Sequence, residues 1–167
     1  MAYAIGLPLM ALLAILQSAV ASQLRLADGR ADLVLVAVVA WALTGRSQEA
    51  MVLGLAGGLF LDLLSALPLG STGLAMVLVA FVVSLTEGRL WGAHLLTPLG
   101  VVFAASSFFS AYMLLASVIV GARVDVPSLA SRILLPETFL NMLLAIPAAQ
   151  LATGLKRALV PPEVEIG

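Results

Sequence analysis

Asp62 is the residue most able to do chemistry, because it is the one acid well inside a long apolar stretch, residues 48–67. A carboxylate in the hydrocarbon of a membrane is costly unless it is paired, hydrated or protonated, which makes it a functional-site candidate by default. Three interpretations remain open: pairing or capping at the Pro68-Leu69-Gly70 turn, contact with a partner or ligand, and a proton relay. Ser65, the backbone of that turn, or Arg132 is its expected hydrogen-bonding or ion-pair partner.

Small residues recur at every fourth position around Asp62, so they share one face of a helix. The face comprises Ala50, Gly54, Gly58, Asp62 and Ala66, and Gly57 widens it. Gly54-xxx-Gly58 is the spacing by which membrane helices approach one another closely. This small-residue face therefore predicts close helix packing, either within the protein or against the transmembrane helix of a partner.

Milder polar residues occur in the last two apolar stretches. Ser106, Ser107 and Ser110, together with Ala104 and Ala111, form a small-residue patch typical of helix packing. Asn141 and Gln150 are expected to be buried and, with Thr153, to make hydrogen bonds between helices, while Pro147 is expected to kink its helix. None of these sets converges on a reaction.

No enzymatic arrangement is visible in the sequence. It contains no Ser/His/Asp arrangement, no HExxH, no GxGD-type dyad and no phosphate-cradling loop. The absence of cysteine excludes disulfides and thiol chemistry, and the single His94 cannot form a multi-histidine site. A net charge of −1 does not favour nucleic-acid binding. We therefore expect a protein that is not an enzyme and that uses no cofactor or metal.

The composition is that of an integral membrane protein. Of the 167 residues, 62% are hydrophobic and 10% are charged, and the mean hydropathy is +1.16, whereas a soluble domain carries about 25% charged residues. At about 20 apolar residues per span, the chain has room for about six helices. The sequence predicts one all-α, six-helix transmembrane domain over residues 1–157 and a short disordered tail over residues 158–167.

The expected spans differ in length. They cover residues 3–22, 33–44, 48–67, 72–86, 95–120 and 136–153. The second is only about 18 Å long, against a hydrocarbon core of about 30 Å, so it must recruit loop residues, tilt little or stop partway. The fifth, at about 39 Å, must tilt or protrude. Ser47 is the predicted N-cap of the third span, with Glu49 in its first turn.

The basic residues leave the orientation open, because Lys and Arg divide four against four between the two sides of the expected bundle. An even number of spans still places both termini on one side. Ala19-Val20-Ala21 resembles a signal-peptide cleavage site, but no Lys or Arg precedes Arg25. We therefore expect the first apolar segment to be a span and not a cleaved signal.

Two stretches of the sequence carry motifs in a distinctive order. The first contains Asp32-Leu33-Val34-Leu35, Gly45-Arg46, Gly54 to Gly58, Leu61-Asp62-Leu63-Leu64-Ser65, Pro68-Leu69-Gly70 and Gly73-Leu74-Ala75. The second runs from Glu137 through Thr138 and Asn141 to Leu144, with Pro147 and Lys156-Arg157. Both stretches resemble the MreD family of rod shape-determining proteins. The first is similar to the family's short second span, its Gly-rich third span ending in Asp-Leu-[Leu/Ile]-Ser, and its Leu-Gly turn, and the second is similar to the family's last helix. Ala66 departs from the pattern, since the family commonly has Gly after the Ser.

The resemblance implies a fold similar to the substrate-binding subunits of energy-coupling-factor transporters. It also implies a non-enzymatic component of the machinery that builds the lateral cell wall of rod-shaped bacteria. The expected direct partner is MreC, in a larger complex with RodA, a class B penicillin-binding transpeptidase and MreB. The expected location is the bacterial cytoplasmic (inner) membrane, with membrane lipid as a further partner and both termini in the cytoplasm.

These expectations combine into a hypothesis about how MreC binds. Either the small-residue face at Ala50, Gly54 and Gly58 or the small face of residues 95–120 receives the transmembrane helix of MreC. Asp62 and the Pro68-Leu69-Gly70 turn then hold the outer end of that contact. The alternative is a small-molecule or lipid-binding subunit of a transporter, which the short second span and a buried acid favour. A cavity lined by Leu, Val and Ala suits a lipid better than a vitamin.

Overall fold

The computed structural model describes residues 2–20, 30–65, 68–85, 97–119, 121 and 134–159. In this part of the chain there are six helices and no strand. The helices are α1 (Ala2–Val20), α2 (Leu33–Ala42), α3 (Ser47–Leu64), α4 (Ser71–Ser84), α5 (Thr97–Ile119) and α7 (Leu135–Leu159). The all-helical prediction is confirmed. Expectations that concern Ala66, His94, Arg132 and residues 160–167 lie outside the described residues.

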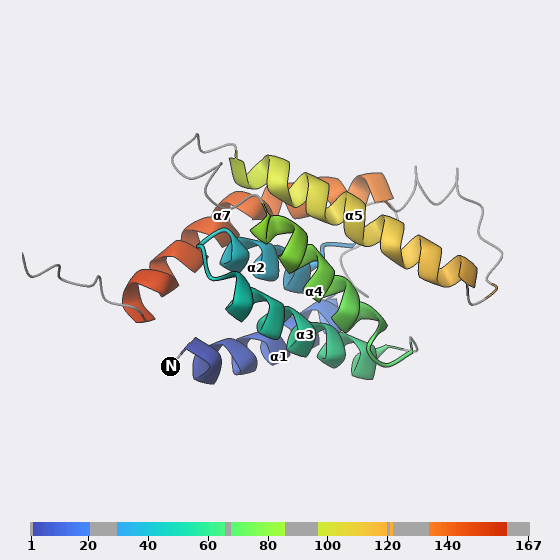
Figure 1. Ribbon diagram of the computed structural model, residues 1–167, viewed down its shortest axis with the longest axis horizontal. Coiled ribbons are helices and arrows are strands. Elements are labelled where there is room, and N and C mark those ends of the chain that lie inside the picture. The colour runs from blue at the N-terminus through green and yellow to red at the C-terminus, as the bar shows by residue number, and fades with distance from the viewer. Residues whose placement is uncertain are drawn as a thin grey trace, which may run out of the picture.

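The short helix α2 lies at the centre of the bundle (Figure 1). It packs against each of the other five described helices, and eight of its ten residues are buried. Because neighbouring helices surround α2, its length does not have to match the thickness of a hydrocarbon layer. Burial within the protein therefore explains how a span of ten residues is accommodated.

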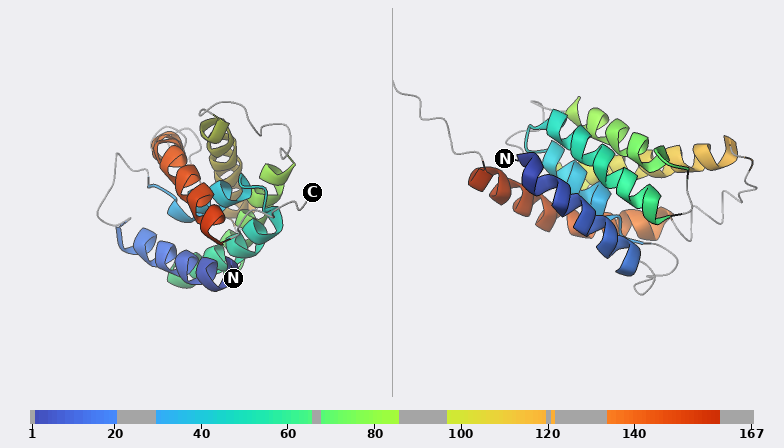
Figure 2. Two further views of the ribbon diagram at one scale, coloured as in Figure 1. Left: turned by 90° about the vertical axis from the view of Figure 1, so that its left-hand side faces the viewer. Right: turned by 90° about the horizontal axis from the view of Figure 1, so that it is seen from below.

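The other helices form two groups around α2. In one group α3 packs against both α1 and α4, and in the other α5 packs against α7. α5 and α7 run antiparallel, side by side (Figures 1 and 2). The start of α1 and the end of α7 lie at the same end of the molecule (Figure 2).

Most helix ends differ from the expected spans by a few residues, and two of these differences change the residues that cap or end a helix. Arg46, and not Ser47, is the N-cap of α3, and Gly45, with a φ of 81°, directly precedes it. Glu49 does lie in the first turn of α3. α7 continues through Pro147 to Leu159, so Ala158 and Leu159, expected in the tail, are helical. Lys156 and Arg157 occupy its last turn, where the helix dipole favours cations.

The outer surface of the bundle is apolar. Large hydrophobic side chains such as Leu12, Phe103, Leu143 and Leu151 are exposed on α1, α5 and α7. Three helices, α3, α5 and α7, are long and apolar enough to cross a membrane. An apolar exterior of this kind is typical of contact with lipid or with other membrane helices. The structure thus supports a membrane protein, while the number of six spans stays a prediction.

Candidate functional site

Asp62 caps the start of α4 from the end of α3. Its carboxylate accepts hydrogen bonds from the backbone amides of Gly70 (2.8 Å), Thr72 (3.2 Å) and Gly73 (3.5 Å). The N-cap of α4 is Gly70, which has no side chain and a φ of 92°, so Asp62 satisfies amides that would otherwise have no partner. The side chain is only 2% exposed. Of the three interpretations of Asp62, these contacts favour capping.

The turn that joins α3 to α4 is held by local hydrogen bonds. The Ser71 amide and hydroxyl both donate to the Pro68 carbonyl, at 3.2 and 2.8 Å. The Ser65 amide and hydroxyl donate to the backbone carbonyl of Asp62. Pro68 and Leu69 are exposed at the tip, so this turn presents them at the molecular surface beside the cap.

The small-residue face of α3 is covered by other helices of the same chain. A Cβ at Gly58 would lie 2.5 Å from the backbone of Gly73, which shows how closely α3 and α4 approach. A Cβ at Gly54 would lie 3.3 Å from Met76 of α4, and one at Gly57 would lie 2.7 Å from Val34 of α2. Ala50, also on this face, is fully buried. In this structure α2 and α4 occupy the face, which favours packing within the protein over docking of a partner helix. Binding of an MreC helix there stays a prediction.

A second polar cluster joins four helices at the start of α2. The Asp32 amide donates to Asn141 Oδ1 on α7 (2.7 Å), and Asn141 Nδ2 donates to Ser106 Oγ on α5 (3.1 Å). Asp32 Oδ1 accepts from the Leu35 amide at 2.9 Å. Gln17 Oε1 of α1 accepts from the amide of Val34, the residue before Leu35, at 3.1 Å. The cluster thus satisfies the first free amides of α2 and ties it to its neighbours.

Burial changes the acidity of Asp32, which precedes α2 and is 6% exposed. Desolvation raises the pKa of Asp32 to about 6, although hydrogen bonds from Leu35, Gln17 and Val34 oppose the shift. Glu137 of α7 lies near enough to Asp32 and Arg30 to interact with them electrostatically. Asp32 falls between the first two expected spans, and its position directly before an apolar run is the N-cap signal that could have identified it.

The remaining predicted polar residues divide between the inside and the outside of the bundle. Ser110 lies one turn beyond Ser106 and is buried, and its hydroxyl has no hydrogen-bond partner among the described residues. Gln150 is exposed, so the prediction that it is buried is wrong. The Thr153 hydroxyl donates to the Ala149 carbonyl of its own helix and not to another helix. Both residues line a groove together with Pro98 of α5.

A polar group that the sequence did not reveal lies at the far end of α2. Trp41 Nε1 donates to Glu49 Oε2 at 3.1 Å, and the other Glu49 oxygen pairs with Arg46. Lys156 Nζ at the end of α7 donates to the Thr44 carbonyl at 2.6 Å. These contacts join α2, α3 and α7 at the end of the molecule opposite to Asp32.

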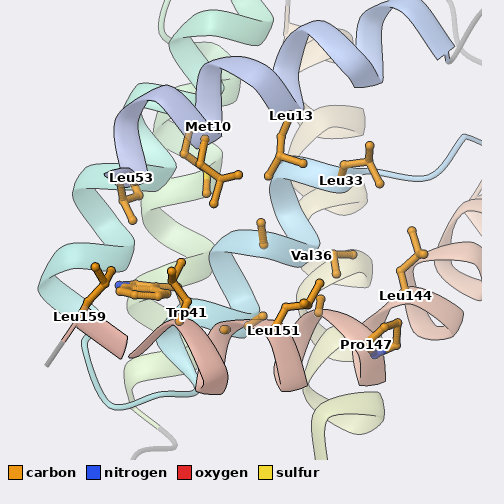
Figure 3. A pocket seen from close by; sticks show the side chains of 17 residues that line it. Met10, Leu13, Leu33, Val36, Trp41, Leu53, Leu144, Pro147, Leu151 and Leu159 are labelled. Carbon is orange, nitrogen blue, oxygen red and sulfur yellow. The ribbon is translucent and has the colours of Figure 1, made fainter. Parts of the chain in front are cut away.

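Between the two polar groups runs an apolar groove, which we call the α1/α7 groove (Figure 3). Its volume is about 300 Å³. α1 and α7 form the walls and α2 forms the floor. Its lining includes Met10 and Leu13 of α1, Ala37 and Trp41 of α2, and Leu144 and Leu151 of α7. An apolar slot that opens on the outer surface can hold a hydrocarbon chain but offers nothing to a hydrophilic solute.

The described residues hold no candidate metal centre. In the ranges that the structure covers, no three His, Cys, Asp or Glu side chains gather in a way that could hold a metal ion. Both buried aspartates accept hydrogen bonds from backbone amides at helix starts. Their contacts are those of structural caps, which position helices.

The comparison with protein families gives a match over almost the whole chain. The model of the family described as rod shape-determining protein MreD matches residues 2–155 of the 167. Neither the comparison with curated proteins nor the comparison with solved structures gave a match. The match contains α1 to α5 and most of α7, so the polar cluster at Asp32 and most of the α1/α7 groove lie within it, while Lys156 and Leu159 lie just beyond it. The chain therefore belongs to the MreD family of rod shape-determining proteins.

Proposed function

We propose that this protein is a non-enzymatic membrane scaffold and regulator of the complex that builds lateral cell wall in rod-shaped bacteria. Family membership implies a role in rod shape determination. In the proposal, the protein binds the transmembrane helix of MreC. RodA, a class B penicillin-binding transpeptidase and MreB belong to the larger complex. The proposed location is the inner membrane, with six spans, a fold like the energy-coupling-factor substrate-binding subunits and both termini in the cytoplasm.

One observation carries the proposal: the polar side chains hold the bundle together, while an apolar surface remains exposed. Asp62, Asp32 and Asn141 all make contacts within the protein. The exposed surface consists largely of Leu, Val, Phe and Ala side chains on the outer helices. Such a molecule is suited to contacts with other membrane helices and not to catalysis.

The outer face of α5 is the face that best supports MreC binding. Gly100, Ala104, Ser107 and Ala111 are all exposed and follow one another at intervals of four, three and four residues. They therefore share one face of the helix. Gly100 and Ala104 also line a groove of about 280 Å³ between α4 and α5. Small residues beside a groove allow the close backbone approach that membrane helices use.

Substitution on this face tests the proposal. Ala104→Leu and Gly100→Leu should each reduce co-purification with MreC, because the larger side chain fills the groove. Both changes should leave folding intact, since Ala104 is exposed and a Cβ at Gly100 would meet nothing within 4 Å. Ala158→Leu, at an exposed alanine of α7, is the matched control. Wild-type recovery of MreC by both α5 variants would exclude this face.

A second candidate is a lipid-binding or small-molecule-binding subunit of a transporter, which the apolar α1/α7 groove favours. Affinity purification of the tagged protein from its native membrane, followed by mass spectrometry, distinguishes the two. Recovery of MreC with RodA and the transpeptidase would support the wall-building scaffold. Recovery of an ATP-binding transporter module would support the subunit of a transporter.

A further inference from the structure

We draw no further inference here: the strongest candidate, the apolar α1/α7 groove that Met10, Trp41 and Leu151 help to line, is open on the outer surface of the bundle, and nothing in the structure shows what covers it.

Discussion

At the scale of single residues, two buried aspartates begin helices. Asp62 caps α4 from another helix, and Asp32 caps α2 from the position directly before it. Each carboxylate accepts hydrogen bonds from backbone amides at a helix start, where the helix itself offers no carbonyl partner. In an apolar environment such amides are costly to leave unpaired. The two acids therefore have a structural use that accounts for their burial.

Replacing Asp62 tests the capping role. Asp62→Ala leaves the amides of Gly70 and Thr72 without an acceptor, and we expect a loss of about 2 kcal/mol or more in the free energy of unfolding. Asp62→Asn keeps one acceptor oxygen, so its free energy of unfolding should fall by less. We also expect Asp62→Asn to restore rod shape in a strain that lacks the protein. Thermal unfolding in detergent measures the first effect and cell morphology the second. An inactive but fully stable Asp62→Asn protein would instead indicate proton transfer.

Asp32 predicts how stability depends on pH. Its pKa is about 6 in the folded protein against an ordinary value of 3.8, so the folded state binds the proton more tightly. Protonated Asp32 makes its full contribution to the stability of the folded protein below pH 3.8. This contribution is lost as the pH rises through about 6. Across this pH range the free energy of unfolding should fall by on the order of 3 kcal/mol.

Asp32→Asn is the control for this pH dependence, because asparagine still caps a helix but does not titrate. Melting temperatures measured from pH 4 to pH 7 should fall for the wild type and should change less for the variant. Parallel curves for the two proteins would show that another group is responsible.

At the scale of helices, the sequence predicted each described helix because the apolar run that marks a helix lies within one short segment of the chain. Apolar runs between polar turns mark all six described helices, and the ends differ from expectation by a few residues at most positions. α7 extends six residues beyond its expected end at Thr153, because Gly154, Lys156 and Arg157 lower the hydropathy without ending the helix. Hydropathy detects the apolar part of a helix and not its continuation into the interface.

Two glycines give a matched pair of variants at this scale. Gly58→Ala places a Cβ at 2.5 Å from the backbone of Gly73, so α3 and α4 must move apart. We expect a loss of about 1–3 kcal/mol in stability. Gly100→Ala meets nothing within 4 Å and should be neutral or stabilising, since alanine favours the helix. Melting temperatures in detergent compare the two. A Gly58→Ala protein as stable as Gly100→Ala would refute the close α3–α4 contact.

At the scale of the whole molecule, a buried short helix organises a bundle with an apolar exterior. α2 contacts every other described helix, and polar groups fasten it at both ends. The start of α1 and the end of α7 lie at the same end of the bundle (Figure 2). This arrangement fits an even number of membrane crossings.

Reporter fusions test the topology. Green fluorescent protein fused to either terminus should fluoresce, and alkaline phosphatase fused at the same positions should be inactive, because we expect both termini in the cytoplasm. Phosphatase fused within residues 122–133 should be active, since that segment follows the fifth expected span. Opposite results at the two termini would require an odd number of crossings and would contradict six spans.

The sequence by itself determined the membrane class, the helices, the family resemblance and the face on which Gly54 and Gly58 lie. Each of these depends on composition or on spacing within a few turns of one helix. Only the tertiary structure decided that α4 covers this face, that Asp62 caps α4, and that Asn141 reaches Asp32 across 109 residues of sequence. The physical reason is that helix formation follows local hydrogen bonding, whereas the choice of packing partner depends on which side chains fit together across the whole bundle.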